Sequence, residues 1–276
     1  MNPARQIERA QRLLALHDRK RVLLLPNAWD AGSARLFDDL GFAAIATTSG
    51  GMAWSLGHAD GEQLPLADIL AATRRIVGAT QLPVTVDFEG GHGATAEAVA
   101  ANVRALISTG IAGLNLEDGI EHRILRDVDD AAARIAAARA AAQANGVPIV
   151  INARVDVWMV GGDASDDVRF ADAIVRARRY LAAGADCIYP IGLADPAMIE
   201  RFIAALDAPV NIGARVGLSA LDELQRIGVA RVSSATRLAT IAYSAARAAA
   251  VNWHDSGRCD GLDASFGYVD MQRLFT

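Results

Sequence analysis

The chain is poor in the residues that mark several protein classes. Its two cysteines, Cys187 and Cys259, are too few for a disulfide framework or a paired CxxC zinc site. No window reaches 18 uncharged apolar residues, so no membrane span is expected. The first 20 residues carry charges throughout and lack the apolar core of a signal peptide. We therefore expect a cytoplasmic protein.

Basic residues are neither in excess nor clustered. There are 27 of them against 32 acidic residues, a net charge of −5, which argues against a nucleic-acid surface. Apolar residues make up 52% of the chain, too many for a disordered protein. The 276 residues suit one α/β barrel, a fold of about 250 residues. No linker interrupts the pattern, so we predict a single domain over 1–276.

Short β-rich runs alternate with alanine-rich helical stretches along the chain. The runs are mostly Val, Ile, Leu and Ala without strict polar alternation, which is typical of parallel strands that helices cover on both faces. Eight strands are predicted, at 21–27, 43–49, 83–89, 113–118, 148–154, 186–190, 209–213 and 230–234.

Helical patterns fill the intervals between these strands. Glycine often stands where a helix would end, and Thr95, Asp129 and Ser219 are candidate N-caps. The main predicted helices are 31–41, 66–80, 94–110, 129–146 and 168–184. Eight such units predict a (β/α)₈ barrel. The alternative is an open doubly wound sheet, but the first strand–helix turn lacks GxGxxG and eight units favour closure.

Two further helices flank this pattern. Residues 1–18 predict a helix before the first strand, and 235–253 predict a last helix that is apolar on nearly all sides. A tail, 256–276, follows. Such a helix and tail suggest a subunit interface, although a role within the domain is the alternative.

Carboxylates follow several of the predicted strands, at the barrel end where chemistry takes place. Asp87 and Glu89 share one face of their strand, Glu117 ends the next strand, and Asp60 lies in the loop after the second. Carboxylates that converge repel one another unless a cation neutralises them, and oxygen ligands suit Mg²⁺ or Mn²⁺. For each residue alone, the alternative is a solvated loop carboxylate.

Arg154 follows the apolar strand PIVINA and suits bidentate recognition of a carboxylate or phosphate. The alternative is a structural salt bridge to one of the same acids. The turn Thr48-Ser49-Gly50-Gly51 offers hydroxyls and backbone amides to an anion.

The histidines are weaker candidates. His58, His92 and His122 are candidate acid/base groups in loops over the predicted mouth, with solvated loop residues as the alternative. His17 is expected at the surface.

Taken together, the motifs LPNAWDAGSARLFDDLGFAAIATTSGG, SLGHADGE, VDFEGGHG, AGLNLEDG, INARVD and GADCIYP resemble, in that order, the isocitrate lyase/phosphoenolpyruvate mutase superfamily. The resemblance covers about residues 20–245. It implies a (β/α)₈ barrel whose eighth helix is exchanged between the subunits of a dimer, within a tetramer.

The resemblance also implies site residues. The direct Mg²⁺ ligand falls on Asp87, and its neighbours, mostly acting through water, fall on Asp60, Glu89 and Glu117. The arginine that grips a substrate carboxylate falls on Arg154. Residues Thr48, Ser49 and Gly50 match the turn that binds a 2-oxo acid; an ungapped match puts Thr48 at the serine position. We add Asn211 to the predicted substrate-binding residues, and Glu117 and His122 to the catalytic ones beside Arg154.

Two departures from the family pattern limit the reactions that the resemblance implies. The stretch EDGIEHRILRDVDD lacks the KKCGH-type loop of isocitrate and methylisocitrate lyases, and it lacks the longer gating loop of the mutases. Ile191 stands where relatives place a histidine or glutamate. The acid/base that protonates an enolate is then His122, His92 or a bound water.

We therefore expect a Mg²⁺-dependent carbon–carbon lyase or decarboxylase for a small 2-oxo or 2-hydroxy dicarboxylic acid. It would act through a pyruvate-enolate-like intermediate, as a homo-oligomer, a dimer or tetramer. One alternative is a P–C bond enzyme of the phosphonopyruvate hydrolase or phosphoenolpyruvate mutase kind. The other is a catalytically weak barrel that binds a 2-oxo acid.

Overall fold

Parallel strands and helices alternate along the chain. The computed structural model describes residues 3–160 and 162–276. Every predicted strand is present, within a few residues of the predicted bounds. The strands are β1 (Leu23–Leu25), β2 (Asn27–Ala28), β3 (Ile45–Thr47), β4 (Val84–Asp87), β5 (Gly113–Glu117), β6 (Gly119–Ile120), β7 (Ile124–Leu125), β8 (Val150–Val155), β9 (Cys187–Pro190), β10 (Asn211–Gly213) and β11 (Arg231–Ser233).

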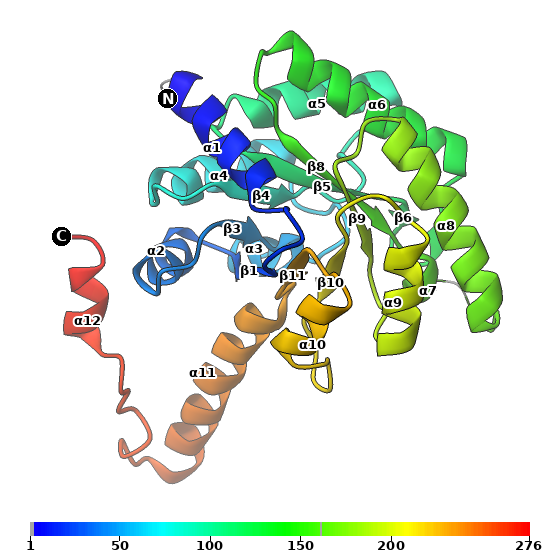
Figure 1. The fold of residues 1–276 in the computed structure, drawn as a ribbon. Coiled ribbons are helices and arrows are strands. Elements are labelled where there is room, and N and C mark those ends of the chain that lie inside the picture. Colours follow the sequence, from blue (N-terminus) through cyan, green and yellow to red (C-terminus); the bar gives the residue numbers. More distant parts are fainter. Residues whose placement is uncertain (1–2, 161) are drawn as a thin grey trace.

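Hydrogen-bonded neighbours run in the order β2-β3-β4-β5-β8-β9 in one parallel sheet and β1-β11-β10 in another. Two seams join them. At one seam β1 and β2 are consecutive and separated only by Pro26, which has no N–H to donate to a neighbouring strand. At the other, Ile188 of β9 forms a bridge with Val210, just before β10. The order of neighbours therefore runs round a ring, as the predicted barrel requires (Figure 1).

Helices cover the outside of this ring (Figure 1). Both faces of β8 are buried as a result: all six of its residues are buried, as expected for a strand of a parallel sheet that helices cover. The helices are α1 (Pro3–Ala15), α2 (Ala31–Asp39), α3 (Ser49–Ser55), α4 (Leu66–Gly78), α5 (Ala96–Ile107), α6 (Val128–Ala144), α7 (Val157–Val160), α8 (Asp166–Ala182), α9 (Pro196–Ala204), α10 (Leu221–Arg226), α11 (Arg237–Ser256) and α12 (Tyr268–Arg273).

The predicted helix starts were right in one case of three. The Thr95 side chain caps α5. Asp129 is already inside α6, whose cap is Asp127, and α10 begins after Ala220 rather than at Ser219. Asp127 and Asp129, separated only by Val128, cannot be told apart by residue type, because an aspartate at either position accepts the free N–H groups of a first turn.

The helix α11 does not cover the ring. It projects away from the body of the molecule, and a loop leads from its end to α12 (Figure 1). Only Ala239 of α11 is buried, while Ile241 is 62% and Trp253 52% exposed. None of the helices within the described residues combines the length and apolar character of a membrane span.

A groove of about 510 Å³ lies on the outside of the ring. It lies over the outer face of β1, between the end of α2 and the start of α10, and its walls include Leu24, Leu40, Phe42 and Leu221. Leu24 of β1 is 42% exposed there.

Candidate active site

A cavity of about 340 Å³ lies at the carboxyl ends of the strands. This is the end at which barrel enzymes place their chemistry. Its walls are Asn27, Thr48, Ser49, Asp60, Asp87, Asn115, His122, Arg154, Met159, Tyr189, Ile191, Ser233, Ala235 and Thr236. Six of the expected site residues thus line one cavity: Thr48, Ser49, Asp60, Asp87, His122 and Arg154. Gly50 does not line it but lies beside Asp60, since a Cβ on Gly50 would lie 3.0 Å from Asp60 Oδ2.

Asp87 is the last residue of β4. Its Oδ2 accepts a hydrogen bond from the Ser49 hydroxyl at 3.0 Å, whereas its buried Oδ1 has no partner among the described residues. Burial raises the pKa of Asp87; the charges of Glu89 and Asp60 add to the rise, and Arg154 opposes it. A carboxylate in this setting gains stability from a nearby cation.

Asp60 brings a second free oxygen to the cavity. Its Oδ1 is buried without a partner, and its Oδ2 lies 3.8 Å from Nε2 of His122. Burial alone would raise the pKa of Asp60, but the neighbouring polar groups of His122, Ser49 and Gly61 lower it overall. The proximity of the Asp60 carboxylate in turn raises the pKa of His122.

Glu89 points to the loop that carries Asp60. Its Oε1 accepts hydrogen bonds from the backbone N–H groups of Gly61 (3.0 Å) and Glu62 (2.6 Å), and its Oε2 lies 3.2 Å from Nε2 of His92. Both carboxylate oxygens of Glu89 therefore have partners, and its hydrogen bonds hold the loop that carries Asp60.

Arg154 lies between two buried carboxylates at the end of β8. Asp156 binds it in a bidentate manner, at 2.8 Å to Nε and 2.6 Å to Nη2, and Glu117 forms an ion pair with Nη1. These negative charges raise the pKa of Arg154 despite its burial, so the guanidinium is charged. Burial raises the pKa of Glu117, and Arg154 opposes that rise.

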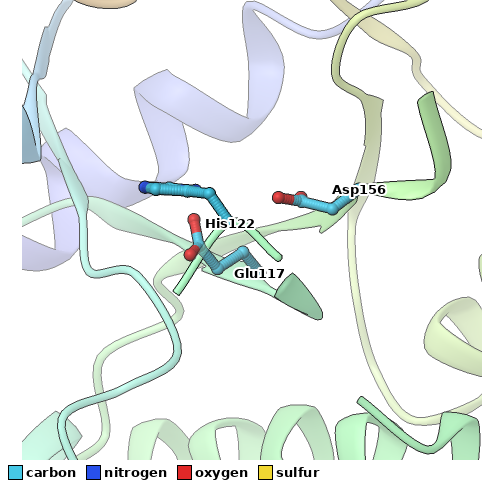
Figure 2. A group of neighbouring side chains, drawn as sticks. All are labelled: Glu117, His122 and Asp156. Carbon is cyan, nitrogen blue, oxygen red and sulfur yellow. The ribbon is translucent and has the colours of Figure 1, made fainter. Parts of the chain in front are cut away.

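Glu117, His122 and Asp156 form a group of potential metal ligands, with one atom from each within 4.8 Å of the others (Figure 2). The guanidinium of Arg154 already forms ion pairs with both carboxylates of this group, so a metal ion there would meet a positive charge. The free oxygens of Asp87 and Asp60 are better suited to a cation.

The hydroxyls of Thr48 and Ser49 have different roles. Thr48 caps α3, and its Oγ1 accepts a hydrogen bond from the Gly51 N–H, whereas the Ser49 hydroxyl reaches Asp87. Asn211 is fully buried and does not line the cavity; its Nδ2 donates to the hydroxyl of Ser233, which does.

Asn115 is a functional candidate that the sequence analysis missed. Its Oδ1 accepts hydrogen bonds from Nδ2 of Asn152 (2.9 Å) and Nη2 of Arg231 (3.4 Å), both buried below the cavity. This leaves the amide N–H groups of Asn115 available on the cavity side. The signal was an asparagine two residues before Glu117 in an otherwise apolar strand. Asp156 was missed too, although it follows Arg154 by two residues and so shares its strand face.

Comparisons with known proteins agree with this geometry. The family model for phosphoenolpyruvate phosphomutase matches residues 13–254. A solved structure from Burkholderia cenocepacia J2315, provisionally named a phosphonomutase, shares 43% identity with a TM-score of 0.84 and covers 87% of this chain and 98% of its own.

Three curated relatives extend the comparison. Uncharacterized protein Rv1998c of Mycobacterium tuberculosis H37Rv is 35% identical over 86% of this chain and 85% of its own length. The 2-methylisocitrate lyase of Escherichia coli K12 is 35% identical over 66% of this chain and 61% of its own length. Oxaloacetate decarboxylase 2 of Pseudomonas fluorescens Pf0-1 is 30% identical over 75% of this chain and 70% of its own length. The chain therefore belongs to the phosphoenolpyruvate phosphomutase family, within the isocitrate lyase/phosphoenolpyruvate mutase superfamily.

Proposed function

We propose that this protein is a Mg²⁺-dependent carbon–carbon lyase or decarboxylase for a small 2-oxo or 2-hydroxy dicarboxylic acid. The observation that carries the proposal is the pair of buried, unpartnered oxygens, Asp87 Oδ1 and Asp60 Oδ1, in the same cavity as a charged arginine. The names of a lyase and a decarboxylase among the relatives support it.

Asp87 and Asp60 would hold the metal ion, with Glu89 and Glu117 behind them. When bound, a divalent ion would supply positive charge that stabilises the negative charge developing on the acid. Mg²⁺ and Mn²⁺ both suit oxygen ligands.

The protein side chains would position the acid and supply a proton. Arg154 keeps N–H groups for a substrate carboxylate, and Asn115 offers its amide. In a decarboxylation, the C3–C4 bond breaks, CO₂ leaves, and the electron pair passes to the C2 oxygen as an enolate. A proton placed on C3 then gives the 2-oxo acid product. His122 lies on the cavity wall and is our candidate for the donor.

The first test measures pyruvate release from oxaloacetate, 2-methylisocitrate, dimethylmalate and phosphonopyruvate, with Mg²⁺ and with EDTA. We expect release from one member with Mg²⁺ only. Asp87→Ala should lower that rate by roughly 10³-fold, because several kcal/mol of charge stabilisation depend on the ion. Asp207→Ala, which removes a fully exposed carboxylate, is the matched control. Wild-type turnover by Asp87→Ala would overturn the metal site.

Chemistry at a P–C bond is the second candidate, favoured by the family match and by the similarity to the phosphonomutase structure. Phosphate release from phosphonopyruvate would identify a hydrolase, and interconversion with phosphoenolpyruvate a mutase. Oxalate binding with Mg²⁺ and no turnover would instead indicate a barrel that only binds a 2-oxo acid.

We also propose that two chains exchange α11. The groove over β1 and the exposed residues Ile241 and Trp253 of α11 are apolar. The rest of the described chain leaves both surfaces exposed. A second copy of this chain provides a helix for the groove and a groove for the helix.

A further inference from the structure

The ionisable groups of the cavity are confined to one side of it. Asp60, Asp87, His122 and Arg154 follow β3, β4, β5 and β8, which are consecutive neighbours in the sheet. Polar groups that would bind a carboxylate and a metal ion are thus gathered over one arc of the barrel.

The remaining walls come from the rest of the ring and from α7. Ile191 follows β9, Ala235 follows β11, and Met159 lies on α7. Tyr189 belongs to the same side, and burial raises the pKa of its phenol, so this group is neutral. The other contributors here, from Asn27, Ser233 and Thr236, are uncharged.

A second substrate carboxylate would find no countercharge on this side. Among the described residues that line the cavity, Arg154 is the only arginine, and it lies on the opposite side, with Asp60, Asp87 and His122. Arg215 and Arg237 lie nearby but are exposed and outside the lining, and each donates to a backbone carbonyl, of Gly192 and Ala214 respectively. A carboxylate placed against Ile191 would lose water without gaining a cation.

We infer that the substrate carries an uncharged, apolar group on the side opposite its metal-binding carboxylate, and that this group packs against Ile191, Met159 and Ala235. The inference rests on the proposed function and narrows it to an alkyl-substituted acid. The cavity volume of about 340 Å³ is near the lower end for ligand sites, so this group is small.

Binding of two isosteric 2-oxo acids tests the inference. 2-Oxoglutarate and 5-methyl-2-oxohexanoate share the carboxylate and 2-oxo group, and differ only in a terminal carboxylate against an isopropyl group. Neither has a carboxylate β to the ketone, so neither decarboxylates during the measurement. Calorimetry with Mg²⁺ should give at least about tenfold tighter binding of 5-methyl-2-oxohexanoate. Equal or tighter binding of 2-oxoglutarate would overturn the inference.

Substitutions in the apolar wall provide a second test of the inference. Ile191→Arg should reduce or reverse the preference because it supplies a cation, whereas Val175→Arg, on the exposed surface of α8, should leave it unchanged. Met159→Arg replaces Ile191→Arg if the latter does not fold. An unchanged preference in a folded wall variant would contradict the placement of the alkyl group.

Oxalate separates this inference from the proposed function. It has two carboxylates but no arm that reaches the apolar wall. If oxalate binds with Mg²⁺ and the preference is absent, the inference alone fails. If oxalate does not bind, the proposed function fails and the inference fails with it.

Discussion

His17 is a buried histidine that the sequence placed at the surface. Its Nδ1 lies 2.8 Å from the carbonyl oxygen of Leu13, and its Nε2 is buried without a partner among the described residues. Burial, and next the positive charge of Arg231, lower the pKa of His17 to about 4. The residue follows a charged helix in the sequence, and only the packing of α1 beneath the barrel removes it from water.

This pKa makes stability depend on pH. His17 ionises near 6.5 in the unfolded chain and near 4 in the folded one, so protonation favours unfolding. Its effect is absent above about pH 6.5 and grows as the pH falls to 4, to about 3 kcal/mol. Urea unfolding between pH 7.5 and 4.5 should show this loss, and His17→Gln should reduce the slope. The exposed His254→Gln is the control; an equal effect of both variants would contradict the assignment.

Site residues at strand ends were easier to predict than those one layer deeper. Asp87 and Arg154 end their strands after apolar runs, and that position alone brings them to the cavity. Asn211 is also in a strand, but it pairs with Arg231 in the layer below Ser233. Depth in a barrel depends on strand register, which the sequence does not reveal.

At the scale of elements, the segment after β5 forms a short hairpin of β6 and β7 that carries His122. Its turn places Glu121 (φ 49°) and His122 (φ 55°) in the left-handed region. Glutamate is disfavoured there, whereas asparagine and histidine are among the residue types that tolerate it. The sequence did not predict the antiparallel pairing of β6 with β7 in this segment.

Glu121→Asn should therefore stabilise the protein by about 0.5 kcal/mol, measured by thermal unfolding. Glu121 is exposed, so little else changes. Arg123→Asn, at the neighbouring exposed position outside the left-handed region, is the matched control and should not stabilise. A gain of equal size in both variants would show that turn conformation is not the cause.

At the scale of the whole molecule, the order of strands followed from the sequence because each strand–helix unit repeats the same local pattern. The position of the last helix did not. An apolar helix predicts burial, but it does not say whether its own chain supplies the cover, and here the described chain leaves α11 exposed.

Charge on either partner surface should separate the subunits. Leu24→Asp in the groove and Ile241→Asp on α11 should each shift the protein toward monomers in size-exclusion chromatography with light scattering. Val175→Asp introduces the same charge on the exposed face of α8 and should leave the assembly unchanged. A wild-type protein that is monomeric at micromolar concentration would refute the exchange.

The outward direction of α11 also has a genetic consequence. If two chains exchange this helix, a substitution in α11 weakens the barrel of the neighbouring subunit rather than its own. In a cell that makes both wild-type and variant chains, mixed assemblies would then contain wild-type barrels covered by a defective helix. Such an allele would behave as partly dominant, whereas the loss of Asp87 would impair only the subunit that carries it.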